Sequence, residues 1–313
     1  MKEFSYTSSD GESIINAYIW DDAKDNAGGC RGILQLVHGF SEHSMRYREF
    51  AEHMSAAGYI VCAHDQLGHG RSAAGRFGYI GKNGHKLLVK DTYKLTAMVK
   101  DKYKDYDLPV VIMGVGTGSL VARYVCSLWG IEYSGAIFSG TTCGGVFINT
   151  LYRLLALSQD VRMGRLKRKR GQKEALRINK LMHGRYNKAF RNSEHGQSWL
   201  SRDKEEVNAF NADPLCGFAL TYGACIDFLK LARITNSRGW PVRIPKNMPI
   251  YLFSGLNDPM GDFGRGVIKV YGELVNAQCT DIEIKLYEDA RHEMLFELNK
   301  DEVYEDILKW LNS

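Results

Sequence analysis

The chain has 313 residues, of which 44% are hydrophobic and 25% are charged, and its formal net charge is +5. This composition argues against intrinsic disorder and suffices for one large folded domain that carries an insertion. No segment reaches the roughly 18 uninterrupted apolar residues of a membrane span, and the N-terminus lacks the apolar stretch of a signal peptide. We therefore expect a cytoplasmic protein.

Short apolar runs typical of β-strands alternate with helical patterns along most of the chain. In chain order, strands are expected at residues 18–20, 33–37, 59–63, 110–113, 135–138, 250–253 and 282–286. Helices are expected at residues 47–57, 87–103, 117–129, 264–275 and 302–311. This alternation predicts the α/β class, with a mostly parallel, doubly wound sheet that is covered by helices on both faces.

The alternation stops between residues 141 and 242, where the sequence is helical, irregular and rich in basic and aromatic residues. We interpret this stretch as a cap insertion between two parts of one core, residues 1–140 and 243–313. Since both ends of the insertion adjoin core strands, the cap is expected above the carboxyl ends of the sheet, where ligands bind in open α/β folds.

The cap also contains most of the excess positive charge. Between Arg162 and Arg191 lysines and arginines are frequent, and Glu174 is the only acidic residue. The usual interpretation of such a run is a solvated helical face, and the alternative is weak contact with an anionic membrane surface or with the phosphate of a lipid substrate. No recognised nucleic-acid-binding module accompanies the run, so we expect no nucleic-acid partner.

Seven cysteines are scattered along the chain without a Cys-x-x-Cys pair. This pattern indicates neither a disulfide framework nor a zinc site. We expect reduced, buried thiols, no metal and no organic cofactor.

A five-residue segment, Gly114-Val115-Gly116-Thr117-Gly118, has the outline of a nucleophile elbow. Such an elbow is a strand-turn-helix with the pattern Gly-x-Ser-x-Gly, in which the small outer residues let the strand and the helix approach each other. An apolar run precedes the segment and a helical pattern follows it, as an elbow requires. Glycine, however, occupies position 116, where the attacking serine belongs.

The two partners of a hydrolase nucleophile follow it in the chain in the order acid, histidine. Asp258 lies on a turn after the expected strand 250–253, and His292 follows the expected strand 282–286. Taken alone, an Asp-Pro pair after a strand is usually a plain turn, and a single late histidine is equally uninformative. Together with the elbow, their order and spacing predict a triad remnant formed by Gly116, Asp258 and His292.

An oxyanion hole requires two backbone N–H groups, one from the residue after the nucleophile and one from the loop after the third strand. Thr117 is the candidate for the first. Phe40 is the candidate for the second, because His38-Gly39 follows the expected strand 33–37 directly. Both groups belong to the main chain, so loss of the serine leaves them in place.

These motifs, together with His38-Gly-Phe-Ser-Glu-His-Ser-Met-Arg-Tyr47 and Asp65-Gln-Leu-Gly-His-Gly-Arg-Ser72, resemble the monoacylglycerol lipase and lysophospholipase-like branch of the α/β-hydrolases, also called serine aminopeptidase-like. The resemblance covers essentially the whole chain. It implies a small-molecule, lipid-like carboxylic ester as substrate, Gly116 at the nucleophile position, Asp258 and His292 as its partners, and Phe40 and Thr117 as oxyanion donors. It further implies structural roles for Glu42, His43, Asp65 and His69.

Gly116 has no side chain that can attack a carbonyl or form an acyl-enzyme. Thr117 and Ser119 lie beyond the turn, so we expect their hydroxyls to point away from His292. Three explanations remain open: deliberate replacement of a serine, natural loss that leaves a non-catalytic binder of an acyl or aromatic ligand, and residual hydrolysis by water with His292 as general base.

Overall fold

The structure is a computed structural model that describes residues 1–22, 29–143, 175–190 and 197–313. Its eight strands form one sheet in the order β1-β2-β4-β3-β5-β6-β7-β8. The pairs β1/β2 and β2/β4 are antiparallel and all other pairs are parallel. The strands are β1 (Lys2–Thr7), β2 (Ile14–Trp20), β3 (Gly32–Val37), β4 (Tyr59–His64), β5 (Val110–Val115), β6 (Gly135–Ser139), β7 (Ile250–Gly255) and β8 (Ile282–Tyr287). The predicted mostly parallel α/β sheet is confirmed.

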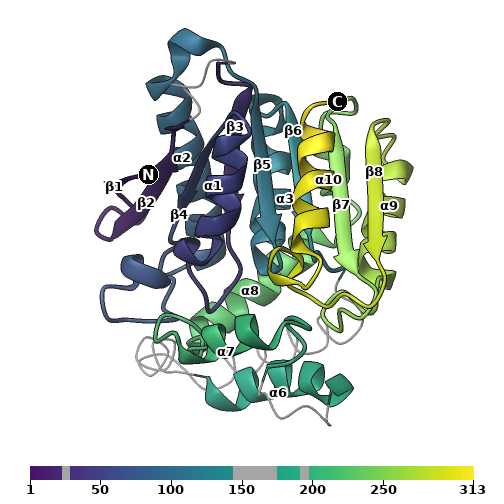
Figure 1. The fold of residues 1–313 in the computed structure, drawn as a ribbon. Helices are drawn as coiled ribbons and strands as arrows, with labels where there is room; N and C mark the ends of the chain where they lie inside the picture. The colour runs from purple at the N-terminus through teal and green to yellow at the C-terminus, as the bar shows by residue number, and fades with distance from the viewer. Residues whose placement is uncertain (23–28, 144–174, 191–196) are drawn as a thin grey trace.

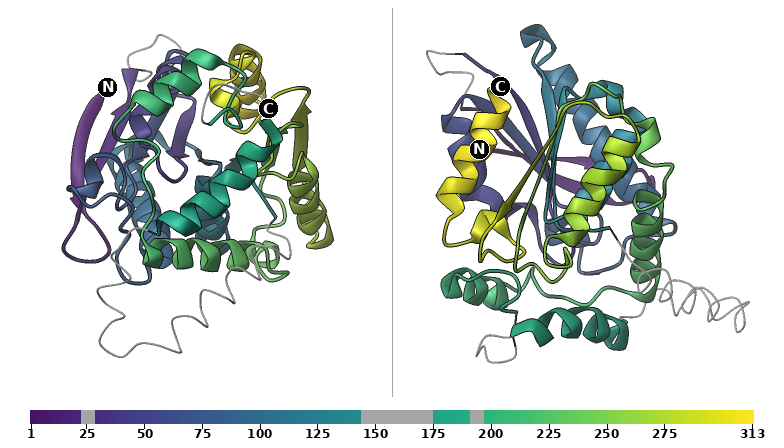
Figure 2. Two further views of the ribbon diagram at one scale, coloured as in Figure 1. Left: turned by 90° about the horizontal axis from the view of Figure 1, so that it is seen from below. Right: turned by 90° about the vertical axis from the view of Figure 1, so that its right-hand side faces the viewer.

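Helices cover both faces of this sheet (Figures 1 and 2). Helices α1 (Arg48–Ala56) and α10 (Lys300–Leu311) pack on one face. Helices α2 (Gly84–Lys102), α3 (Thr117–Trp129) and α9 (Arg265–Asn276) pack on the other. The sheet is therefore doubly wound.

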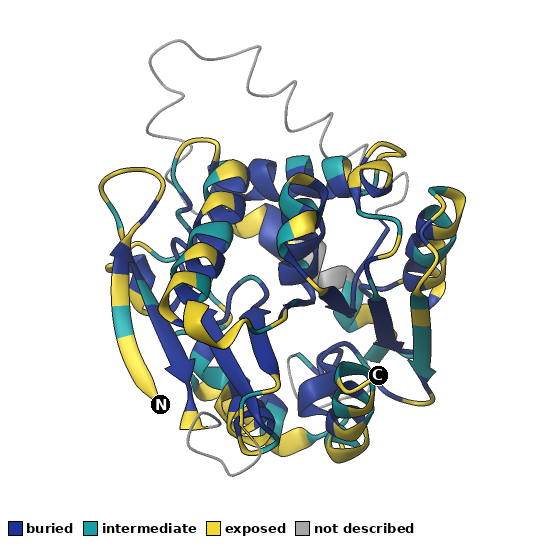
Figure 3. Cartoon of the chain, turned by 90° about the horizontal axis from the view of Figure 1, so that it is seen from above, coloured by how far each residue is buried: buried dark blue, intermediate teal, exposed yellow. Residues whose placement is uncertain are grey.

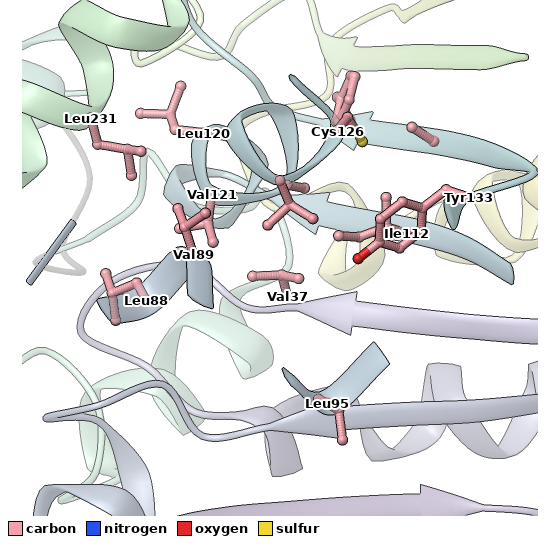
Figure 4. Close-up of a cluster of buried hydrophobic side chains, with 14 of the residues drawn as sticks. Val37, Leu88, Val89, Leu95, Ile112, Leu120, Val121, Cys126, Tyr133 and Leu231 are labelled. Atoms are coloured by element: carbon pink, nitrogen blue, oxygen red, sulfur yellow. The ribbon is translucent and has the colours of Figure 1, made fainter. Parts of the chain in front are cut away.

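The side-chain alternation of the central strands separates the two cores. On β3, Ile33 and Val37 join the core under α2 and α3, whereas Leu34 and Leu36 join the core under α1 and α10. Successive side chains of a strand point to opposite faces, so a strand buried on both faces reads as a continuous apolar run. Figure 3 shows the central strands buried along their length, and Figure 4 shows Val37 among side chains from α2 and α3.

Among the described residues between β6 and β7, the helices α6 (Leu176–Asn187), α7 (Lys204–Ala212) and α8 (Tyr222–Thr235) stand at the carboxyl ends of the strands (Figure 1). Hydrogen bonds attach this region to the core. Gly217 N donates to Ser41 O over 2.8 Å, and Glu293 N donates to Leu200 O over 2.7 Å.

Strand β1 was not predicted from the sequence. Its exposed positions alternate with Phe4 and Tyr6, so the segment has too few apolar residues to stand out as a buried strand. Most of the basic run, residues 162–174 and Arg191, lies outside the described residues. Within the described part of the chain, the structure contains no helix that is both long and apolar enough to cross a membrane.

Candidate active site

The turn between β5 and α3 has the geometry of a nucleophile elbow. Gly116 joins the strand to the helix with φ 53° and ψ −120°, in a region that favours glycine. A β-carbon on Gly114 would lie 2.5 Å from the Cα of Ser119, and one on Gly118 would collide with the carbonyl oxygens of Val37 and His38. The outer glycines are therefore required by the close approach of strand, helix and loop.

Asp258 and His292 meet at the carboxyl edge of the sheet. Asp258 follows β7, His292 follows β8, and Oδ2 of Asp258 lies 2.9 Å from Nδ1 of His292. The Asp258 carboxylate also accepts hydrogen bonds from the backbone N of Met260 over 2.8 Å and from Oγ of Ser254 over 3.2 Å. These contacts fix the carboxylate, which in turn orients the imidazole.

The other ring nitrogen of His292 faces Gly116, since a β-carbon at position 116 would lie 2.8 Å from Nε2. Burial lowers the pKa of His292, but the carboxylate of Asp258, with smaller contributions from Glu293 and Glu42, outweighs burial and raises the pKa above the ordinary value of 6.5. The ring of Trp199 covers the imidazole at a centroid distance of 5.1 Å. The structure thus brings together all three residues of the predicted triad remnant.

The loop after β3 that carries Phe40 is held by a buried network. Glu42 accepts hydrogen bonds from Gly39 N over 2.5 Å and from the hydroxyl of Tyr47 over 2.9 Å. Arg46 joins Glu42 to Glu293, with nitrogen-oxygen distances of 2.5 and 2.7 Å. The residue next to His292 is thereby tied to the loop that presents Phe40.

The two expected oxyanion donors, Phe40 and Thr117, also lie together. Their arrangement contains one contact that sequence analysis did not foresee: Phe40 N donates a hydrogen bond to Oγ1 of Thr117 over 2.6 Å. As expected, the Ser119 hydroxyl is turned away from the imidazole and donates to Gly116 O over 2.5 Å.

A pocket opens over Gly116 and His292. Its walls come from the loop after β3, the elbow, the region between β6 and β7, and the segments after β7 and β8. The aromatic and apolar side chains that line it include Phe40, Trp199, Leu200, Phe210, Phe228 and Met260. Such a lining suits an apolar ligand with a polar group placed at the imidazole.

One group of the described residues has the atom types of a metal site. His43, Asp213 and Cys216 place one ligand atom each within 4.8 Å of one another, although the sequence indicated no metal site. His43 Nε2 and Asp213 Oδ2 already pair over 2.9 Å. This pair connects the loop after β3 to the segment after α7, which is a structural role of the kind expected for His43.

The model of the serine aminopeptidase S33 family matches residues 28–299. The chain belongs to this family. Members of the same branch are similar over most of their length. The human monoglyceride lipase is 27% identical over 298 residues, covering 91% of this chain and 84% of its own, and a monoglyceride lipase homolog of monkeypox virus is 25% identical, covering 89% and 87%.

Among solved structures, a thermostable carboxyl esterase from Bacillus coagulans in complex with glycerol has a TM-score of 0.90 at 29% identity, covering 99% of this chain and 97% of its own. The chain therefore has an α/β-hydrolase scaffold of the esterase and monoglyceride lipase type.

Three contributors to the site were not predicted from the sequence: the hydrogen bond to the Thr117 hydroxyl, the Arg46 bridge and Trp199. The sequence could have pointed to Arg46, because this residue lies in the same motif as Glu42. It could not have pointed to Trp199, since this residue lies in an irregular segment without periodicity.

Proposed function

We propose that this protein is a hydrolase scaffold for carboxylic esters with an acyl chain, in which Gly116 takes the place of the nucleophile, so that the chain hydrolyses esters very slowly or not at all. In this proposal Asp258 and His292 are the acid and base of the former triad, and the backbone N–H groups of Phe40 and Thr117 are the oxyanion donors. Acyl transfer through a serine at position 116 would be the ancestral reaction.

The observation that carries this proposal is the orientation of the His292 ring, which is paired with Asp258. Nδ1 of His292 pairs with Asp258, and Nε2 faces position 116, where a serine hydroxyl would need a general base. A histidine with a purely structural role would not need to point at a glycine, which offers it no side-chain contact, beneath an apolar pocket. The names of the relatives support the substrate class, since several are monoglyceride lipases.

The second candidate function is a binder that uses the same pocket for an acyl or aromatic ligand without turning it over. The observation that favours it is the contact between Phe40 N and Thr117 Oγ1, because a site that binds without chemistry does not need a free oxyanion donor. The same contact is compatible with a former hydrolase, so a reaction must distinguish the two.

The test is Gly116→Ser with a serine-directed alkyl phosphonate probe, followed by mass spectrometry of the adduct. A former hydrolase is expected to be labelled at position 116 and to hydrolyse short acyl or monoacylglycerol esters. The matched control is Gly116→Ser with His292→Ala, which retains the hydroxyl but lacks the base. Failure of a folded Gly116→Ser variant to label or to turn over any ester favours the binder.

We further infer that residues 141–242 form a cap on a core made of residues 1–140 and 243–313, supported by the position of α6, α7 and α8 over the strand ends. The basic run within it would make weak contact with an anionic lipid surface. Vesicles of anionic lipid are expected to bind more weakly at high salt and after neutralisation of Lys167, Arg168, Lys169 and Arg170. Binding that responds to neither change contradicts this inference.

A further inference from the structure

The Thr117 hydroxyl accepts the backbone N–H of Phe40, one of the two groups expected to bind an oxyanion. Phe40 N points at the Thr117 hydroxyl oxygen over 2.6 Å, the length of a strong hydrogen bond. Donors of an oxyanion hole act by pointing, over 2.7 to 3.1 Å, at the position that the developing oxyanion will take. One of the two expected donors is therefore already engaged by an acceptor from the protein itself.

Both partners of the contact between Phe40 N and Thr117 Oγ1 are held in place by their surroundings. Thr117 is the first residue of α3, and Gly116 before it has the backbone geometry of the elbow. On the other side, Glu42 fixes the loop by accepting from Gly39 N, and Glu42 is itself held by Tyr47 and Arg46. Phe40 packs between the rings of His69 and Phe228 at centroid distances of 5.3 Å. The N–H of Phe40 cannot turn away easily, so the hole opens chiefly by rotation of the Thr117 side chain.

A carbonyl oxygen that enters the hole must displace the Thr117 hydroxyl and then accept from the same N–H. Removal of one oxyanion donor typically lowers kcat by about 10² to 10³. A donor that is occupied by the Thr117 hydroxyl should lower kcat by less than a donor that is absent, because the threonine side chain can rotate away. We propose that the Thr117 hydroxyl is an internal occupant of the oxyanion hole, so that efficient acyl transfer at this site needs two changes: a serine at position 116 and loss of the hydroxyl at position 117. This inference rests on the proposed function.

Threonine suits this role by its shape as well as its hydroxyl. Its β-branch limits χ1 to a small set of staggered rotamers, so the hydroxyl either points at Phe40 or rotates to one of the few other positions. Valine has the same branching but no hydrogen-bond acceptor, and serine has the acceptor without the extra methyl group. Exchange among these three residues separates the hydroxyl from the bulk of the side chain and leaves the N–H of residue 117 in place.

The experiment compares Gly116→Ser with two double variants, Gly116→Ser/Thr117→Val and Gly116→Ser/Thr117→Ser. The readouts are the second-order rate of phosphonate labelling and the hydrolysis of p-nitrophenyl butyrate. The valine variant is expected to react about 10- to 100-fold faster than Gly116→Ser, within the limit set by loss of a whole donor. The serine variant retains the block and remains slow.

A second measurement does not require catalysis. In the Gly116 background, the backbone amide proton of Phe40 is expected to resonate far downfield because of its short hydrogen bond, and to move upfield in Thr117→Val but not in Thr117→Ser. Equal labelling rates in all three variants, or an unmoved Phe40 resonance, overturn the role of Thr117 while leaving the proposed function intact. If none of the folded serine-116 variants labels, the proposed function fails and this inference fails with it.

Discussion

A β-carbon on Gly116 would lie 2.8 Å from Nε2 of His292, which is closer than β-carbons approach other heavy atoms. The imidazole therefore occupies part of the space that a side chain at position 116 would need. Asp258 holds the ring from behind and Trp199 covers it, so the ring has limited room to withdraw. A side chain introduced at position 116 should therefore destabilise the fold in two ways, through strained backbone angles and through its close contact with the imidazole.

Both effects lead to a prediction for stability. Gly116→Ala and Gly116→Ser are expected to lower the free energy of unfolding by about 1 to 3 kcal/mol, because a residue other than glycine is strained at φ 53°. The measurement is urea denaturation of each variant. Gly272 in α9 is the matched control, since a β-carbon there would meet no atom within 4 Å. Gly272→Ala should raise the stability by about 0.5 to 1 kcal/mol; a similar loss at both positions would refute the strain.

The pKa of His292 depends on Asp258. In Asp258→Asn the carboxylate is lost while burial remains, so the pKa is expected to fall from above 6.5 to below it. The ring proton signals of His292, followed by NMR from pH 4 to 9, report this shift. A folded pKa above the unfolded one stabilises the protein below about pH 6.5, and this stabilisation disappears as the pH rises through the folded pKa. In Asp258→Asn it should be absent, and an unchanged titration would contradict the assigned pairing.

The buried bridge through Glu42 is expected to contribute to stability more than surface pairs do. Glu42→Gln replaces a carboxylate that accepts from Gly39 N and Tyr47 and pairs with Arg46. We expect a loss of about 1 to 3 kcal/mol in the free energy of unfolding, since buried charged partners are left incompletely satisfied. The control is Glu52→Gln, whose pair with Arg48 is exposed and should change stability by less than about 1 kcal/mol. Equal effects in the two variants would contradict the importance of the buried network.

The order of the motifs predicted which distant segments meet. Parallel strands end at one edge of a sheet, so turns after β5, β7 and β8 had to bring position 116, Asp258 and His292 to that edge. Their catalytic roles remain predictions. The expected strands and helices of the core are present in the structure. Two differences are β1, whose pairing with β2 places few apolar side chains in the core, and β2, which begins at Ile14 instead of residue 18.

Other features of the site depend on side-chain directions that no linear pattern encodes. The hydroxyl of Thr117 reaches Phe40 across 77 residues of sequence, and Arg46 reaches Glu293 across 247. Each contact is decided by a rotamer that becomes defined only when loop and helix pack against each other. The proximity of His43, Asp213 and Cys216 was unforeseen for the same reason, since these residues come from two segments that meet only in the fold.

Buried histidines away from the reacting groups should govern the response of this protein to acid. Burial lowers the pKa of His38 to about 4 and of His64 and His69 to about 3. A lowered folded pKa means that stability is fully present above about pH 6.5 and is lost as the pH falls towards the folded pKa. The protein is therefore expected to lose stability between about pH 6.5 and 4, before most carboxylates titrate.

His64 on β4 isolates this effect, because within the described part of the chain neither of its ring nitrogens has a hydrogen-bond partner. His64→Met replaces the ring with an uncharged side chain of similar volume, which should change stability by less than about 1.5 kcal/mol at pH 8. At pH 5, which is about 1.5 pH units below the unfolded pKa of histidine, the neutral buried imidazole lowers the free energy of unfolding by about 2 kcal/mol, at about 1.36 kcal/mol per pH unit. The methionine variant has no such loss. Urea denaturation at the two pH values measures the difference. If the variant gains no more stability at pH 5 than at pH 8, His64 is not held neutral in the native state and the acid sensitivity has another origin.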